Sequence, residues 1–170
     1  GAGTVTVTAL EGKLDADLST IVAATAFTAA LSSTGNVTVL AAADLGTATV
    51  NIAGTDTVTV ASGATVDAAH LVMATTSTIT GAAVDLSGVQ TSGAGTVTVT
   101  ALEGKLDADF STIIAATAFT AALDASTARE IATGADLGTA TVNIAGTNTV
   151  TIASGATVDA AHLVMATTST

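Results

Sequence analysis

The chain contains no cysteine, proline, tryptophan or tyrosine, and only three phenylalanines among its 170 residues. Without cysteine it has neither disulfide bonds nor thiolate metal ligands. Its only basic residues, Lys13, Lys105 and Arg129, stand against fourteen acidic residues, and the formal net charge is −11. Binding to nucleic acid or to anionic lipid needs a basic surface that neutralises phosphate, so the composition disfavours both kinds of partner.

The chain also lacks an apolar run that would span a bilayer. The most apolar long window, IVAATAFTAAL at residues 21–31, is short and interrupted by threonine. Hydrophobic residues still make up 49% of the chain, so a core must be built from Val, Ile, Leu and Ala. Because β-branched Thr and Val fit pleated strands well, the composition predicts an all-β fold. There is no Met at position 1 and no signal peptide, and we expect a piece of a longer or processed product.

The main feature of the sequence is a tandem repeat. Residues 1–31 return at 93–123, an offset of 92 (93 − 1 = 92), and the same offset relates residues 43–78 to residues 135–170. Only four positions differ in these matched parts: Leu18/Phe110, Val22/Ile114, Asp56/Asn148 and Val60/Ile152. Near-identical tandem copies are typical of fibres, stalks and surface coats, because their length is their function.

Short Val/Thr strands are predicted at residues 3–8, 36–40, 48–52, 56–60 and 78–80. A quarter of the offset gives about 23 residues per unit, which suits one coil of a β-solenoid. The sequence therefore predicts a stacked-coil β-helix, with copy 1 at residues 1–92 and an incomplete copy 2 at residues 93–170 in one continuous solenoid. Tandem immunoglobulin-like β-sandwiches are the alternative, since their unit has a similar length. The absence of Trp, Tyr and of a Pro-marked linker favours the solenoid.

The densest carboxylate cluster predicts a calcium site in each copy. Asp-x-Asp on a flexible loop supplies two of the several oxygen ligands that calcium needs. The alternative is a solvated acidic turn, partly neutralised by Lys13 or Lys105. The six candidate ligands are Glu11, Asp15, Asp17, Glu103, Asp107 and Asp109.

Each copy contains a single histidine, His70 or His162, next to Leu-Val-Met. A zinc or catalytic role needs further ligands or a nucleophile held by a third group. We therefore interpret both histidines as half-buried packing residues, and no catalytic residue is predicted.

Thr-x-Thr motifs recur at residues 4–8, 55–59 and 76–80. Alternate strand residues lie about 6.8 Å apart and neighbouring strands about 4.8 Å apart, so a flat threonine surface would suit ice binding. Such a surface needs the motif at one fixed position in every coil. In the sequence the motif recurs irregularly, which favours ordinary outward-facing threonines.

One stretch breaks the repeat: DASTAREIATG at residues 124–134 shares no identical position with SSTGNVTVLAA at residues 32–42. Asp124 is a plausible N-cap, Ala-Arg-Glu favours helix and Gly134 is a plausible C-cap. This pattern predicts one helical turn or a protruding loop where copy 1 has a strand. Either a coil was replaced without a new role, or a surface insertion was altered.

The segments GTVTVTALEGKLDAD, ADLGTATVNIAGT and ASGATVDAAHLVM resemble the giant Thr/Ala/Gly/Val-rich repetitive secreted proteins of bacteria, of the S-layer, large-adhesin or extracellular-filament type. The resemblance implies an exported, cell-surface protein that self-associates and often binds calcium. We expect a structural repeat module of a rigid rod, not an enzyme. The alternatives are a binding module, such as an adhesin or ice-binding segment with a Thr-rich face, and a carbohydrate-cleaving solenoid, for which aromatic sugar platforms are nearly missing.

Overall fold

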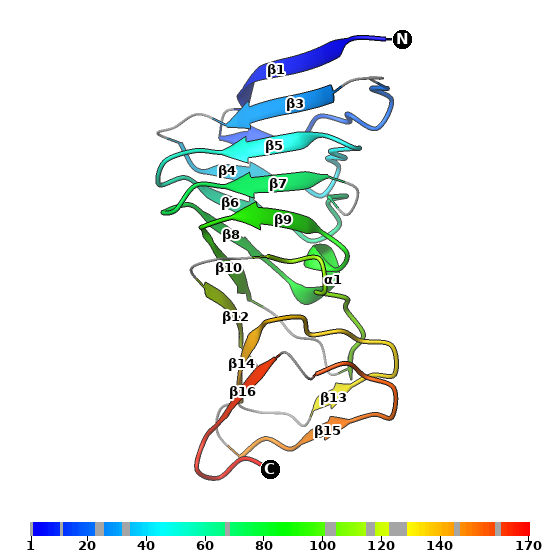
Figure 1. Ribbon diagram of the computed structural model, residues 1–170, viewed down its shortest axis with the longest axis vertical. Coiled ribbons are helices and arrows are strands. Elements are labelled where there is room, and N and C mark those ends of the chain that lie inside the picture. The colour runs from blue at the N-terminus through cyan, green and yellow to red at the C-terminus, as the bar shows by residue number, and fades with distance from the viewer. Residues whose placement is uncertain are drawn as a thin grey trace.

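In the computed structural model, the chain winds into a β-solenoid whose successive coils stack along one long axis (Figure 1). The predicted fold is confirmed. Every strand pairing among the described residues is parallel, whereas immunoglobulin-like sandwiches are antiparallel. The structure describes residues 2–10, 12–22, 26–31, 35–66, 69–100, 105–114, 118–122, 129–144, 147–158 and 161–170.

Each coil has three sides, and two of them are continuous sheets in the first copy. Side 1 is a five-stranded sheet of β1 (Thr4–Leu10), β3 (Ala26–Leu31), β5 (Thr49–Ile52), β7 (His70–Met73) and β9 (Gln90–Gly93). Side 2 is an eight-stranded sheet that runs through both copies. Its strands are β2 (Lys13–Leu14), β4 (Val37–Val39), β6 (Thr57–Val60), β8 (Thr78–Gly81), β10 (Thr96–Val99), β12 (Ala118–Ala122), β14 (Thr141–Ile144) and β16 (His162–Met165).

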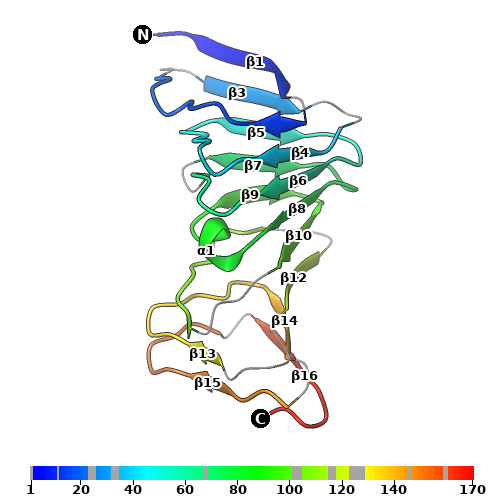
Figure 2. The same ribbon diagram turned by 180° about the vertical axis from the view of Figure 1, so that it is seen from behind.

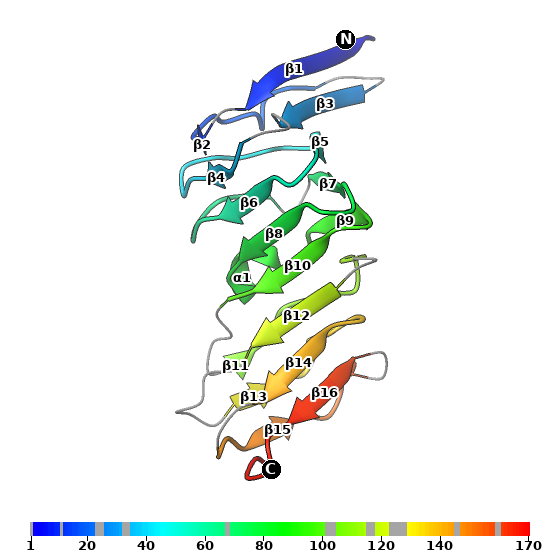
Figure 3. The same cartoon turned by 90° about the vertical axis from the view of Figure 1, so that its left-hand side faces the viewer.

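Side 3 changes character along the axis. In copy 1 it is a column of single parallel bridges, from Asp17 to Asp44 to Thr65, followed by the short helix α1 (Ala83–Leu86). Asp85 of α1 accepts a hydrogen bond from the N–H of Gly63, at 3.0 Å, which fixes the helix against the coil before it. Beyond α1, along the same edge of the molecule, lies a three-stranded sheet (Figures 2 and 3). It consists of β11 (Lys105–Leu106), β13 (Arg129–Ile131) and β15 (Val150–Ile152).

A regular coil advances the residue number by 21, because Thr49 pairs with His70 (70 − 49 = 21) and Thr141 pairs with His162 (162 − 141 = 21). The predicted coil of about 23 residues is wrong, since it assumed that one repeat holds a whole number of coils. Four regular coils advance the number by 84 (4 × 21 = 84), so the offset of 92 leaves a remainder of 8 (92 − 84 = 8). This remainder carries the chain around one more side. A repeat therefore spans four and one third coils.

As a consequence, copy 2 is rotated by one side relative to copy 1. Strands β1, β3, β5 and β7 of side 1 have their sequence counterparts, β10, β12, β14 and β16, on side 2. Strands β2, β4 and β6 of side 2 have theirs, β11, β13 and β15, on side 3. The bridge column of side 3 reappears as Asp109, Asp136 and Thr157, and the carbonyl of Asp109 accepts a hydrogen bond from the N–H of Gly88, just before β9 of side 1.

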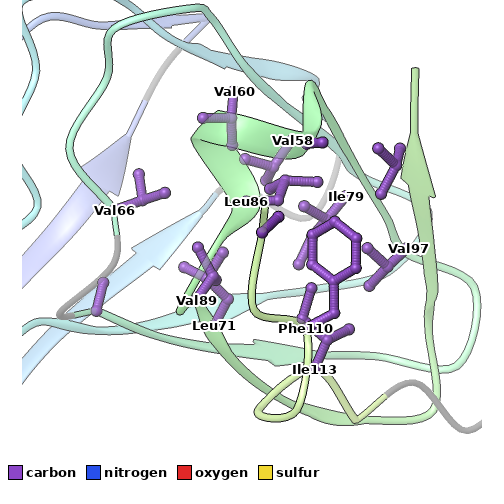
Figure 4. Packing of buried hydrophobic residues seen from close by; sticks show 14 of the residues in the cluster. Val58, Val60, Val66, Leu71, Ile79, Leu86, Val89, Val97, Phe110 and Ile113 are labelled. Carbon is purple, nitrogen blue, oxygen red and sulfur yellow. The ribbon is translucent and has the colours of Figure 1, made fainter. Parts of the chain in front are cut away.

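The core is a continuous column of aliphatic side chains, because alternate strand residues point inward. At the junction of the copies Phe110 is fully buried and lies close to Ile79, Val97 and Ile113 (Figure 4). Its copy-1 counterpart, Leu18, is only partly buried. The larger side chain thus belongs to the core at the junction of the two copies.

The rewritten stretch at residues 124–134 does not form a helical turn where the structure describes it. Arg129–Ile131 is strand β13, paired with β11 and β15, at the place in the repeat that β4 occupies in copy 1. Residues 124–128, with the predicted N-cap Asp124, lie outside the described residues. Strand pairing on both sides outweighs the modest helix propensity of Ala-Arg-Glu. Glu130 is exposed and Ile131 is buried, so the inward-outward alternation of a coil strand is retained.

Candidate functional site

Within the described residues, a regular column of threonines runs along the outer surface of side 2. These side chains alternate with buried Val and Ile residues, so they point away from the core. Six consecutive strands place a threonine at the same register position: Thr38, Thr59, Thr80, Thr98, Thr120 and Thr141.

A second, shorter column runs beside the first. Thr57, Thr78 and Thr96 are register partners on β6, β8 and β10, two residues before Thr59, Thr80 and Thr98 on the same strands. Three neighbouring strands thus carry Thr-x-Thr in register. We call the nine threonines of the two columns the threonine array. Figure 3 shows its strands one above another from β4 to β14.

The array exists because copy 2 is rotated by one side. The TVTV segment of copy 1, in β1, lies on side 1, whereas its counterpart in copy 2 is β10 on side 2. There it continues the long column, which begins on β4, and the short column, which begins on β6. The Thr-x-Thr motifs of β6, β8 and β10 therefore fall in register in space although their spacing in the sequence is irregular, whereas the predicted motif at residues 4–8 lies on side 1.

The array carries no charge within the described part of the chain. The outward register positions from Thr38 to Asn143 hold no acidic or basic residue, while Lys13 and His162 lie at the two ends of the long column. The carboxylates of Asp17, Asp44 and Asp85 lie on side 3. Side 1 is mixed, since its equivalent column begins with three threonines and then changes, reading Thr6, Thr28, Thr49, His70 and Gln90.

The hydroxyl groups of the array are available to solvent. Other threonines use their hydroxyls for hydrogen bonds within the described chain: Thr76, Thr91, Thr112, Thr133, Thr149 and Thr170. All of these lie outside the array. Most array side chains are half-buried by their neighbours on adjacent strands, which restricts the β-branched rotamers.

Aspartates shape the corners that lead into and out of the bridge columns. The Asp17 carboxylate accepts hydrogen bonds from the Ser19 hydroxyl (2.5 Å) and the Ser19 N–H (2.9 Å). In copy 2 the Asp109 carboxylate accepts from the N–H of Ser111, at 2.9 Å. Bonds from the serine hydroxyl and then from its N–H stabilise the charged form, so the pKa of each aspartate lies below its ordinary value.

The predicted calcium sites remain a prediction. Asp15, Asp17, Asp107 and Asp109 are exposed, whereas Glu11 and Glu103 lie outside the described residues. Among the residues that the structure does describe, no three His, Asp or Glu side chains form a group that would hold a metal ion. The oxygen of Asp17 that accepts the bonds from Ser19 already serves to shape the turn.

His70 lies half-buried on side 1, as predicted, and its Nε2 is 2.9 Å from the hydroxyl oxygen of Ser92. His162 is exposed. His70 and Ser92 line an open groove where side 1 of copy 1 meets copy 2, together with Gln90, Thr112 and the exposed Ile114. A serine nucleophile needs a base that is itself oriented by a third group. Asp67, the carboxylate nearest to His70 in the sequence, lies outside the described residues.

A buried carboxylate lies at the corner between sides 1 and 2. Asp56 is 2% exposed, and its Oδ2 has no hydrogen-bond partner among the described residues. At the equivalent corners Asn36 accepts a hydrogen bond from the N–H of Thr57, at 3.0 Å, and the Ser77 hydroxyl donates to the carbonyl of Ala74, at 2.9 Å. In copy 2 the counterpart of Asp56 is Asn148, which is equally buried. No signal in the sequence alone distinguishes this aspartate from the exposed ones.

No helix within the described residues is long and apolar enough to cross a membrane. Comparisons with protein-family models, with curated proteins and with solved structures found no match to this chain.

Proposed function

We propose that the chain is a structural repeat module of an extracellular bacterial surface or filament protein, in which stacked coils form a rigid rod. The observation that carries this proposal is the unbroken junction between the copies. β10 of copy 2 pairs with β8 of copy 1 through four register positions, and Phe110 of copy 2 is buried against residues of copy 1. This continuous pairing supports a single rod segment rather than two jointed domains.

The length of such a rod is proportional to the number of copies. One coil adds about 4.8 Å along the axis, so a repeat of four and one third coils adds about 21 Å without changing the width. The absence of cysteine and the net charge of −11 are compatible with a secreted, well-solvated surface. Self-association or neighbouring repeats of the same protein are the proposed partners.

The coil made by β15 and β16 carries exposed apolar residues that support the proposed association. Ile152 and Met165 are 45% and 49% exposed, while their copy-1 counterparts, Val60 and Met73, are 3% and 4% exposed. In copy 1 the following coil provides the cover: a Cβ placed on Gly81 would lie 3.2 Å from Val60. We propose that an equivalent coil, from a further repeat or from another molecule, covers Ile152 and Met165.

Small-angle scattering and electron microscopy test this proposal on the chain and on a version lengthened by one complete repeat. The expected result is a rod that grows by about 21 Å at constant width. In sedimentation, Met165→Asp is expected to reduce end-to-end association, whereas Val22→Asp, at a residue that is 79% exposed, is the matched control. Jointed beads, or compact monomers without rods or fibres at any concentration, would overturn the proposal.

A further inference from the structure

We infer that the threonine array of side 2 is an ice-binding surface, a function separate from that of the rod. It is an ordered, uncharged lattice of hydroxyl and methyl groups, and the carboxylates that the structure describes lie on the other sides and at the corners. The ligand is the surface of ice, together with the ordered water layer that joins it to the protein.

The first support is geometry. Parallel strands set the threonines of one column about 4.8 Å apart, and alternate residues set the two columns about 6.8 Å apart. These repeats are close to the oxygen–oxygen repeats on faces of hexagonal ice. Because the strands are in register from β4 to β14, the long column continues over six coils without a gap.

The second support is the chemistry of the side chains. Threonine carries both a hydroxyl, which hydrogen-bonds water, and a methyl group, which orders the water around it. The array hydroxyls are not engaged by the described chain and are free to bind water. A charged residue would bind its own hydration shell and disrupt the lattice, and none occurs among the outward positions between Thr38 and Asn143.

The third support is that side 2 differs from an ordinary wet sheet face. Outward threonine is common on strands, and side 1 shows the usual mixture, in which Thr6, Thr28 and Thr49 are followed by His70 and Gln90. On side 2, strands from the same repeat sequence form a column in which six consecutive register positions are all threonine. The one-side rotation and the shortened coil between Thr78 and Thr96 are both required for that result.

The test uses the purified protein of 170 residues and measures thermal hysteresis and the inhibition of ice recrystallisation. We expect a concentration-dependent hysteresis gap with faceted crystals. Thr80→Lys, in the centre of the long column, should abolish most of the gap, and Thr49→Lys, in the corresponding column of side 1, should retain it. Circular dichroism melting checks that each variant is folded, and Thr120→Lys replaces Thr80→Lys if that variant does not fold.

The outcomes separate this inference from the proposed rod. Loss of hysteresis in Thr80→Lys with unchanged rod length supports the ice-binding surface. A folded wild-type protein without hysteresis or recrystallisation inhibition overturns it, as does an equal loss in Thr80→Lys and Thr49→Lys. Retention of the protein on neutral polysaccharide beads, without any effect on ice, would assign the array to glycan binding and would also overturn it.

Discussion

Thr78 of β8 and Thr96 of β10 are register partners on side 2, although their positions in the chain differ by only 18 (96 − 78 = 18). In the regular coil between Thr57 and Thr78 the difference is 21 (78 − 57 = 21). Much of the shortening occurs at the corner between sides 1 and 2: β7 and β8 are joined by Ala74–Ser77, whereas β9 and β10 are joined only by Ala94 and Gly95. This corner belongs to the Gly-Ala-Gly that opens copy 2, and it keeps the two copies in one sheet.

The tight corner predicts that Gly95→Ala destabilises the protein. A Cβ at position 95 would lie 2.7 Å from the carbonyl oxygen of Ser77 and 2.8 Å from the Cβ of Met73. Relieving this overlap would shift packed backbone, so we expect a loss of about 1–3 kcal/mol in the free energy of unfolding. Chemical denaturation measures it.

Gly3→Ala is the matched control, because Gly3 holds the same place in copy 1 and a Cβ there meets nothing within 4 Å. It should leave the stability nearly unchanged. If both variants lose equal stability, a steric role for Gly95 at the junction is wrong.

The buried carboxylate predicts that Asp56→Asn stabilises the protein at neutral pH. Asp56 keeps one oxygen buried without a hydrogen-bond partner among the described residues, whereas copy 2 has Asn148 at this place. Replacing a buried carboxylate that has an unsatisfied oxygen by the amide that copy 2 carries at this place is expected to raise the free energy of unfolding by about 1–3 kcal/mol. Thermal denaturation at pH 7 checks the direction.

Asn148→Asp is the reciprocal variant and is expected to lower the melting temperature. A stabilising effect of Asn148→Asp, or a destabilising effect of Asp56→Asn, would show that a bound cation or water network compensates the carboxylate.

Asp17 and Asp109 predict how the stability depends on pH. The folded-state pKa of both groups is lowered, chiefly by the hydroxyls of Ser19 and Ser111. A lowered pKa gives stability that is present above the ordinary carboxyl pKa of about 4 and is lost as the pH falls through the folded-state value. We therefore expect the protein to lose stability on acidification below about pH 4.

Titration by NMR tests the cause. Ser111→Ala should raise the pKa of Asp109 toward its ordinary value and leave that of Asp17 unchanged. Ser62→Ala, at an exposed serine elsewhere on the solenoid, should change neither. An unchanged Asp109 titration in Ser111→Ala would refute this account of the turn.

Several strands could be predicted from the sequence because alternating Val and Thr leave little choice of structure. Residues 48–52, 56–60 and 78–80 are strands β5, β6 and β8 within a residue or two. The strand His70–Met73 was not predicted, since HLVM is too short and too apolar to show alternation. The helix α1 was missed as well, because this single short turn carries no side-chain cap.

The repeat, the all-β class and the solenoid followed from the sequence alone, because composition and near-identical copies constrain the local strand pattern and its repetition. The coil length could not be predicted from the sequence, since it depends on how many residues each corner contains. The threonine array likewise depends on the tertiary structure. A repeat offset of 92 and a coil of 21 do not divide evenly, and only the stacked chain shows that the remainder turns copy 2 by one side and brings β10 beside β8.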